Sequence, residues 1–417
     1  MAFEAIRDPA QGRILLLTAT LFVSYLCVAM PLPIVPVYVT ERLGLGNAWA
    51  GLAVGSAFFS TILTRGYAGG LADRLGAKVA LKRGLILYVA GAAASWLTGL
   101  LFDAPLMAFA VLLTGRLVLG LGESLVGVGV VVWGVNLASP ARSARVLAWI
   151  GVAIYGALAV GGPIGLVLFE RFGFAGATAI SAVLPCLGLL AIWPMAGIAA
   201  QPEVEGPSFW SAIGKIGWQG SIVGLQGVGF AAIGAFFVLY FLDQNWRYAG
   251  LGLTAFGGGF VLVRLLFGHL PDRIGALPVA IGSLAIETVG QALIWIAPGP
   301  VLALVGAFFS GLGCSMVFPA MGREIVRLVA PQQRGTALGG FTAFQDLAYG
   351  LTGPLAGLLA DRAGYGSVFL VGSVAAAAAF LIALRLRWVQ ARSAAPREIQ
   401  VEPPRSKEIP GGRPRLY

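Results

Sequence analysis

Long apolar stretches alternate with short polar clusters along almost the whole chain. Twelve stretches have the roughly 17–25 apolar residues, or somewhat more, that a helix needs to cross about 30 Å of hydrocarbon. Their approximate limits are 14–39, 48–68, 84–102, 106–136, 146–169, 175–197, 217–242, 249–267, 277–297, 301–322, 336–360 and 366–385. A transmembrane barrel would show segments of about 10 residues with alternating polarity, which this sequence lacks. The pattern predicts an all-α membrane protein with twelve transmembrane helices.

Composition supports a membrane protein and argues against several other classes. Of the 417 residues, 58% are hydrophobic and 11% are charged, and the mean hydropathy is +0.87. A soluble globular protein carries about 25% charged residues. The first apolar stretch exceeds the about 7–15 residues of a signal-peptide core, so we interpret it as a membrane helix. The sequence lacks a phosphate-binding loop, a nucleophile elbow and a His-Glu-x-x-His pattern, so we expect no enzyme.

The net charge and the few cysteine and histidine residues limit the kinds of ligand and partner that we expect. The net charge is +10, and we assign it to cytoplasmic loops beside anionic lipid rather than to nucleic-acid binding. Cytoplasmic loops of membrane proteins carry an excess of Lys and Arg. The distribution of basic residues along this chain therefore places both termini in the cytoplasm of a bacterium, with the chain in the inner membrane. It also places Arg65 and Arg264 on the cytoplasmic side. Three cysteines and one histidine show no ligand spacing, so we expect no metal and no cofactor.

The spans divide six and six around the longest polar segment between them. We expect an N-terminal six-helix bundle over residues 1–197 and a cytoplasmic linker over 198–216. A C-terminal six-helix bundle follows over 217–386. Residues 387–417, rich in Pro and charge, are predicted to be a disordered cytoplasmic tail.

The two halves repeat each other. Gly69–Ala77 matches Gly268–Ala276 at an offset of 199 residues. Further pairs share an offset of 191: Gly120–Ser124 with Gly311–Ser315, Gly162–Pro163 with Gly353–Pro354, and Glu170–Gly173 with Asp361–Gly364. The repeat predicts two pseudo-symmetric bundles with a ligand site between them near the midplane, an architecture suited to alternating access.

These residues resemble the major facilitator superfamily over nearly the whole chain before the tail. The motifs are the loop signature Gly70–Lys78, the first-helix proline motif Leu32–Pro36, the fourth-helix arginine motif around Arg116, and the fifth-helix antiporter motif Gly161–Gly165. The first-helix proline motif and the fifth-helix motif are similar to motifs of twelve-span drug/proton antiporters. More narrowly, Arg116–Glu123, Val131–Val135 and Pro331–Gly335 resemble the bacterial YhhS/YfcJ group, whose members are mostly described as effluxers.

The resemblance implies that one loop acts as a gate rather than in substrate chemistry. Its residues are Gly70, Asp73, Arg74, Gly76 and Lys78. Asp73 could sit at the positive end of the helix that begins near Gly335–Thr336. Arg74 and Lys78 would need an acidic partner near the end of the fourth span, where residues 137–145 offer none. Asp272 and Arg273 are expected to do the same in the second half.

Ionisable groups inside the spans are the candidates for proton coupling or substrate contact, since each costs about 2.5–3.5 kcal/mol at mid-helix. Arg116 and Glu123 are seven residues apart, so they share a helix face about 10 Å apart. Desolvation of Glu123 favours the protonated acid, which suits a group that loads and releases protons. Arg116 could stabilise its carboxylate or bind an anionic substrate group. The alternative is a structural role for Glu123 within its bundle.

The second half offers its own carboxyls. Asp346 lies about 15 Å into its span and corresponds to Tyr155 at the offset of 191, so we expect Glu123 and Asp346 to face one central cavity. The alternative is a packing role for Asp346. Glu287 is central in a span that the family places at the periphery, so a direct role is less expected. Further candidate lining residues are Gln345, Gln226 and Tyr25.

Prolines at matching positions of the two halves could allow the helix bundles to move. Gly162 and Pro163 in one half, and Gly353 and Pro354 in the other, predict helix kinks, which suit either rocking of the bundles or plain packing. We expect a monomeric secondary transporter whose partners are protons, membrane lipid and a small organic molecule that it exports by antiport. The alternatives are a proton symporter or uniporter that imports its solute, and a receptor or scaffold that transports nothing.

Overall fold

The computed structural model describes residues 9–101, 103–138, 143–197, 209–329 and 334–394, and within these every regular element is helical. The first half holds α1 (Pro9–Ala29), α2 (Pro31–Val37), the π-helical turn η2 (Tyr38–Arg42), α3 (Asn47–Leu75), α4 (Ala77–Thr98), α5 (Pro105–Leu137) and α6 (Ser143–Ile192). The second half holds α7 (Phe209–Asp243), α8 (Leu251–Phe267), α9 (Leu270–Arg273), α10 (Ala276–Trp295), α11 (Pro300–Leu328), α12 (Arg334–Ala363) and α13 (Gly366–Ala394).

Seven helical stretches of the described residues are long and apolar enough to cross a membrane. They are Gln11–Arg42, Pro105–Leu137, Val146–Ile192, Gly214–Asp243, Ala276–Trp295, Pro300–Leu328 and Gly366–Arg392. The all-α membrane protein expected from the sequence is therefore confirmed at this level. Helix α8 is apolar but has only 17 residues, and α3 and α12 carry charged side chains within their length.

Helix α6 joins two of the predicted spans into one 50-residue element. The helix is interrupted at Gly173, where φ is 67° and ψ is −174°, so the chain turns back without a loop. Gly364, the residue 191 positions later, separates α12 from α13 and has a φ of 76°. A positive φ of this size is open to glycine at little cost, which explains the glycine in both halves.

Close helix contacts repeat at the same offsets. A Cβ on Gly120 would lie 2.0 Å from the carbonyl oxygen of Ala57, and one on Gly311 would lie 1.9 Å from that of Phe256. Gly76 and Gly275, each between two helices, have φ values of 90° and 93°. Glycine at positions 120 and 311 lets backbones touch where a side chain would collide, and glycine at positions 76 and 275 accommodates the positive φ.

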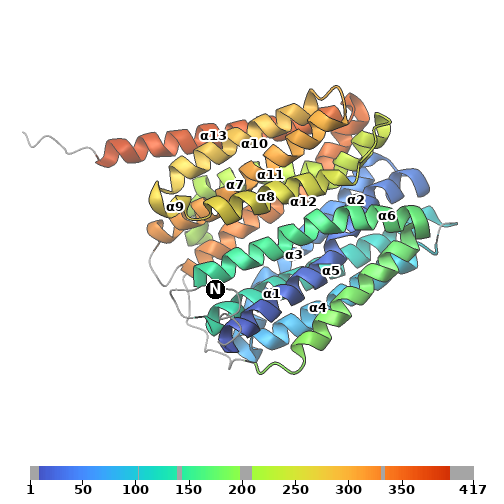
Figure 1. Ribbon diagram of the computed structural model, residues 1–417, viewed down its shortest axis with the longest axis horizontal. Coiled ribbons are helices and arrows are strands. Elements are labelled where there is room, and N and C mark those ends of the chain that lie inside the picture. The colour runs from blue at the N-terminus through green and yellow to red at the C-terminus, as the bar shows by residue number, and fades with distance from the viewer. Residues whose placement is uncertain (1–8, 102, 139–142, 198–208, 330–333, 395–417) are drawn as a thin grey trace, which may run out of the picture.

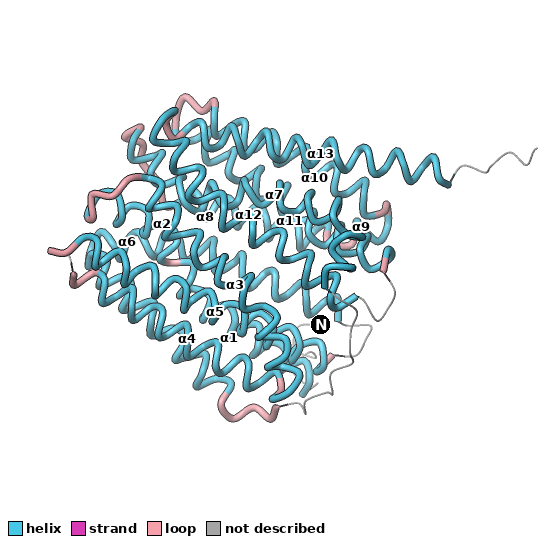
Figure 2. Tube along the Cα trace, turned by 180° about the vertical axis from the view of Figure 1, so that it is seen from behind, coloured by secondary structure: helices cyan, strands magenta, loops and turns pink. Residues whose placement is uncertain are grey.

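The helices form two groups in space. Helices α1 to α6 pack chiefly on one another, as do α7 to α13. Figures 1 and 2 show the second group, with α7, α8, α10, α11, α12 and α13, above α1, α3, α4 and α5. The groups meet along two seams, α3 against α12 and α6 against α8, while α2 touches both α6 and α7. We call these the α3–α12 seam and the α6–α8 seam.

The ends of two helices differ from the segment boundaries expected from the sequence. Helix α7 begins at Phe209, so the later part of the linker expected over 198–216 is helical. Helix α13 continues to Ala394, so residues 387–394 extend a helix instead of starting a disordered tail. Residues 198–208 of the linker and 395–417 of the tail lie outside the described residues. A helix can outlast its apolar stretch because its backbone hydrogen bonds do not depend on burial in lipid.

Candidate functional site

The α3–α12 seam is closed at the end where α3 begins. Asn47 Nδ2 donates to Asp361 Oδ1 over 2.7 Å, and the Tyr365 hydroxyl donates to Asn47 Oδ1 over 2.8 Å. Burial raises the pKa of Tyr365 above its usual value, so its hydroxyl stays a donor. A Cβ on Gly51 would lie 1.9 Å from the Gly353 carbonyl oxygen, so the two backbones touch. We call this the closed end.

The α6–α8 seam is closed by similarly tight contacts. The Thr254 hydroxyl donates to the Ala159 carbonyl oxygen over 2.7 Å. A Cβ on Gly257 would lie 2.7 Å from the Tyr155 carbonyl oxygen, and one on Gly162 would lie 3.0 Å from Leu253 Cβ. The two glycine-proline pairs expected to kink helices thus place Gly162 and Gly353 at the two seams.

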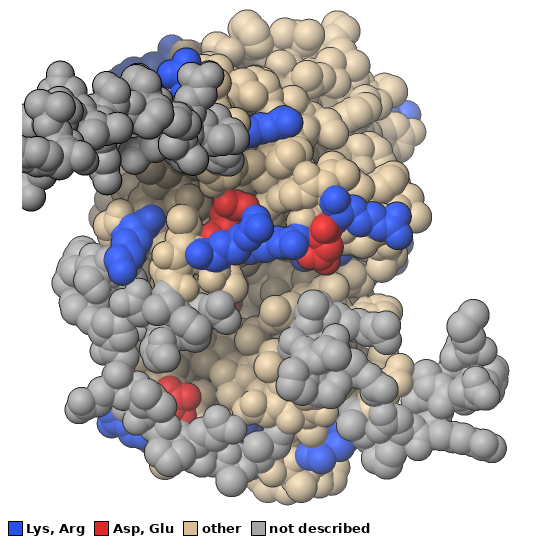
Figure 3. Space-filling model, turned by 90° about the vertical axis from the view of Figure 1, so that its left-hand side faces the viewer, with Lys and Arg blue, Asp and Glu red and all other residues tan. Residues whose placement is uncertain are grey.

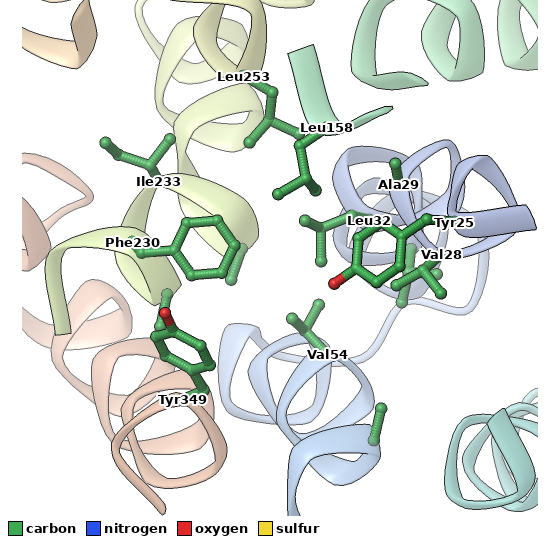
Figure 4. Packing of buried hydrophobic residues seen from close by; sticks show 14 of the residues in the cluster. Tyr25, Val28, Ala29, Leu32, Val54, Leu158, Phe230, Ile233, Leu253 and Tyr349 are labelled. Carbon is green, nitrogen blue, oxygen red and sulfur yellow. The ribbon is translucent and has the colours of Figure 1, made fainter. Parts of the chain in front are cut away.

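The opposite end of the molecule is hollowed between the two groups of helices (Figure 3). Helices α3, α8 and α11 finish at this end, and Lys and Arg side chains gather across it (Figure 3). We call it the open end. Figure 4 shows side chains from both groups meeting deeper in the molecule, with Tyr25 and Leu32 on one side and Phe230 and Tyr349 on the other.

An ion pair joins the two groups between these ends. Arg65 Nη2 of α3 contacts Asp346 Oδ2 of α12, and the two residues are 281 positions apart in sequence. The Asp346 side chain is 11% exposed and that of Arg65 is 29% exposed. The sequence predicted only that Arg65 lies on the cytoplasmic side; in the structure Arg65 lies within α3, which continues to Leu75 and carries Arg65 along the seam.

Glu123 lies half-buried on α5, where it faces the first helix. The Tyr25 hydroxyl donates to Glu123 Oε1 over 3.0 Å. Arg116, on the same helix, is 1% exposed, and its Nε donates to the Ala53 carbonyl oxygen over 3.2 Å. The structure thus brings Tyr25 and Glu123 together, and it gives Arg116 a backbone partner on α3.

Aromatic rings fill the middle of the molecule across both seams. Tyr155 of α6 stacks on Phe260 of α8 with 3.4 Å between ring centroids. The Tyr349 ring of α12 lies 4.9 Å from Phe230 and 5.0 Å from Phe58. The half-buried Gln345 lies beside Asp346 on α12. This cluster supplies an apolar wall next to the charged pair.

Two other predicted residues meet elsewhere, inside the second group. Glu287 and Gln226 are both fully buried, and Gln226 Nε2 donates to Glu287 Oε1 over 3.2 Å and contacts Cys314 Sγ at 2.9 Å. Glu287 Oε2 and Gln226 Oε1 have no hydrogen-bond partner. Neither residue is exposed to the hollow, so the structure separates Gln226 from Tyr25, Glu123 and Asp346.

The expected gate residues lie near the open end. Lys78 Nζ donates to the carbonyl oxygens of Trp193 and Met195 just after α6, so its partners are helix-end carbonyls rather than a carboxylate near α5. Asp272 of the second half pairs with Arg323 Nη1 over 2.8 Å within its own half. Arg74 is exposed and Asp73 half-buried. The expected contact with Gly335–Thr336 falls on side chains outside the described residues.

The sequence interpretation missed Arg65 and Arg264 as site residues. The signal was available, because the offset of 199 that aligns Gly69 with Gly268 also aligns Arg65 with Arg264. An arginine at the same register in both halves is not explained by a loop-charge rule. Among the described residues, no group of three or more His, Cys, Asp or Glu side chains could hold a metal ion.

Comparisons with known proteins agree with this architecture. The family model of the Major Facilitator Superfamily matches residues 17–248 and 220–411. An uncharacterized MFS-type transporter of Salmonella typhimurium is 41% identical over 362 residues, which is 86% of this chain and 92% of the relative. The nucleoside transporter NupG superposes with a TM-score of 0.72 at 15% identity, over 89% of this chain and 99% of that one. The Escherichia coli fucose:proton symporter FucP superposes with a TM-score of 0.64 at 16% identity, over 91% of this chain and 99% of that one.

Proposed function

The chain belongs to the Major Facilitator Superfamily, and on that basis we propose that it exports a small organic molecule in exchange for protons. Members of this family are transporters and not enzymes. The exporter assignment also rests on the sequence motifs that resemble drug/proton antiporters and the YhhS/YfcJ group. Efflux, proton coupling and a monomeric state surrounded by lipid are parts of this proposal.

The transport cycle we propose is alternating access between two six-helix bundles of a twelve-span chain, with boundaries at 1–197, 198–216 and 217–386. Two observations support this cycle. The glycine contacts repeat in both halves, and tight packing between the two groups of helices is confined to α2 and the two seams. The open end is assigned to the cytoplasm, with both termini, because Lys and Arg gather there. In this assignment the structure faces inward, and its closed end faces the periplasm.

The observation that carries proton coupling is the Arg65–Asp346 ion pair across the α3–α12 seam. A proton on Asp346 would cancel the attraction that holds the two helices together at this level. The half-buried Glu123, hydrogen-bonded to Tyr25, is a second carboxyl that can take up a proton. Protonation would therefore change the relative stability of the two states, which is the physical requirement for coupling.

The second candidate is proton-coupled import. Carboxyls that load protons serve symport and antiport equally, and the similar fold of a fucose:proton symporter shows that this architecture accommodates symport. Direction is therefore the property to measure first.

Everted membrane vesicles with an acidified interior distinguish the two candidates. Compounds are taken from a toxicity and metabolite-retention screen of a deletion strain and added outside. Antiport predicts that a substrate releases luminal protons, seen as recovery of acridine fluorescence. The release should be lost in Asp346→Asn and kept in Glu170→Gln, a matched carboxyl-to-amide change at an exposed residue near the closed-end turn of α6. Solute movement accompanied by protons in the same direction would contradict export by antiport.

A further inference from the structure

The internal repeat places an arginine at the same register of two helices that line opposite seams. Arg65 of α3 and Arg264 of α8 are 199 residues apart, the offset that relates these helices. The partner helices are related too, since Asp346 of α12 and Tyr155 of α6 differ by the offset of 191. The two seams are therefore versions of one arrangement, and their chemical difference is informative.

At the α3–α12 seam the arginine is neutralised. Arg65 Nη2 pairs with Asp346 Oδ2, although the buried Arg65 Nε has no hydrogen-bond partner. The pair brings one positive and one negative charge, so it adds no net charge to the space between the halves.

At the α6–α8 seam the corresponding arginine has no carboxylate partner among the residues that the structure describes. Arg264 Nη2 donates to the Ser315 carbonyl oxygen over 2.8 Å, and its guanidinium lies 5.1 Å from the centre of the Phe260 ring. Its Nε is buried without a partner. The position that holds Asp346 at the other seam holds the uncharged Tyr155, which stacks on the same Phe260 ring.

The helices around α8 provide no counter-charge in the part of the chain that the structure describes. Helices α11, α6 and α7 pack against α8, and each carries one acidic residue: Glu324, Glu170 and Asp243 respectively. Glu324 contacts Arg327 and Gln390. Glu170 and Asp243 lie at the closed-end turns of their helices, far from the open-end half of α8. Glu287, on α10, is hydrogen-bonded to Gln226.

Arg264 also faces the other half of the molecule. A Cβ on Gly151 of α6 would lie 3.6 Å from Arg264 Nη1, so the guanidinium spans the seam. A half-buried cation with an unpartnered N–H is stabilised by an anion that brings its own charge and acceptor oxygens. The adjoining Phe260 and Tyr155 rings offer an apolar or aromatic group a surface.

We infer that the site between the halves binds small organic anions, and that Arg264 holds the carboxylate, sulfonate or phosphonate group. This inference names the substrate class of the proposed transporter and so rests on that function. The asymmetry between the seams supplies the selectivity, because Asp346 repels an anion at one arginine while the other arginine attracts it.

Charge-selective modification tests this without a known substrate. Gly151→Cys places a side chain beside Arg264, because the three atoms nearest to a Cβ at this position, 3.6–4.0 Å away, all belong to the Arg264 guanidinium. The parent is the purified full chain with Cys186→Ala, because Cys27 and Cys314 are buried. The rate at which the cysteine at position 151 reacts is measured with two reagents, the anionic sulfonatoethyl methanethiosulfonate and the cationic trimethylammonioethyl methanethiosulfonate. The rate of the parent protein is subtracted from each. Each difference is then divided by the rate at which the same reagent reacts with free 2-mercaptoethanol.

The anionic reagent is expected to react faster by about tenfold or more after normalisation, the size a nearby unit charge produces at an effective dielectric constant near 20. Arg264→Gln should abolish this preference, while Arg264→Lys, which keeps the charge, should retain it. Equal rates, a faster cationic reagent, or a preference untouched by Arg264→Gln would overturn the inference.

The transport assay separates this inference from the function on which it rests. If vesicles exchange protons for organic cations and not for anions, the substrate class is wrong while the transporter assignment stands. If no compound moves but the thiol at position 151 retains its Arg264-dependent anion preference, export is wrong and the anion site stands.

Discussion

At the residue scale, the hydrogen bond between Tyr25 and Glu123 makes this carboxyl a positioned group rather than a stray charge. We predict that Glu123→Gln abolishes transport driven by a pH gradient while leaving substrate exchange at equal pH in place. Tyr25→Phe removes one hydrogen bond of 3.0 Å and should slow transport by about tenfold, the size of a bond to a charged group. Proteoliposome flux with and without a pH gradient measures both effects.

The control for this prediction is protein integrity, measured by gel filtration of each variant in detergent. A folded Glu123→Gln protein with unaltered gradient-driven flux would remove Glu123 from the coupling mechanism. Its alternative role, a structural partner of Tyr25 within the first half, would then be the better interpretation.

Glu287 calls for the opposite expectation. It is fully buried, and its Oε2 has no partner, so a negative charge there would be costly. Glu287→Gln should therefore leave thermal stability and transport nearly unchanged, because the neutral acid and the amide are similar in shape. Glu287→Ala should cost about 1–3 kcal/mol of stability, since Gln226 Nε2 loses its acceptor. Loss of transport in a stable Glu287→Gln protein would instead make Glu287 a coupling residue.

The residue-scale contrast between sequence and structure is clearest for the Arg65–Asp346 pair. Asp346 could be recognised because a lone carboxyl in an apolar stretch is expensive. Arg65 was harder to recognise, because its partner lies 281 positions away and only its match to Arg264 in the repeat pointed to it. Hydropathy reports where a stretch leaves lipid, but not how far a helix continues along a water-accessible seam.

At the element scale, the seam between α3 and α12 depends on glycine. We predict that Gly51→Ala lowers stability by about 1–3 kcal/mol, because the added Cβ would lie 1.9 Å from the Gly353 carbonyl oxygen. Gly66→Ala on the same helix is the matched control, since nothing lies within 4 Å of its Cβ position. Melting in detergent, followed by fluorescence-detected gel filtration, compares the two. Equal melting temperatures would contradict backbone contact at this seam.

The elements themselves follow the hydropathy pattern closely, with differences at their ends. The predicted stretches at 146–169 and 175–197 are two helical segments of α6 that meet at Gly173 without an intervening loop. The stretch predicted over 48–68 extends to Leu75 in α3. Helix ends depend on backbone hydrogen bonding and on glycine conformation. The spans were predicted from the length of each apolar run, which reports neither property.

At the scale of the whole molecule, the duplication was the most informative property of the sequence. The repeated residues have matching local structure: Gly76 and Gly275 both have positive φ values, and Gly120 and Gly311 make matching contacts. The duplication did not reveal which helices meet between halves, because side-chain offsets carry no information on how two bundles dock. The unequal chemistry of the two seams therefore emerged only from the structure.

The central claim is that the two halves rock about their seams and that the Arg65–Asp346 pair stabilises the state with an open end. Spin labels at exposed helix ends report both sides of this motion. Cysteines at Leu75 and Leu328 mark the open end, and cysteines at Leu106 and Val301 mark the closed end. Distances for each pair are measured by double electron–electron resonance in nanodiscs, with and without Asp346→Asn.

Alternating access predicts opposite changes. In Asp346→Asn the open-end distance should shorten and the closed-end distance should lengthen, because the ion pair that holds this state is gone. Distances that stay the same in the variant, or that change in the same direction at both ends, would contradict a rocking motion controlled by this pair.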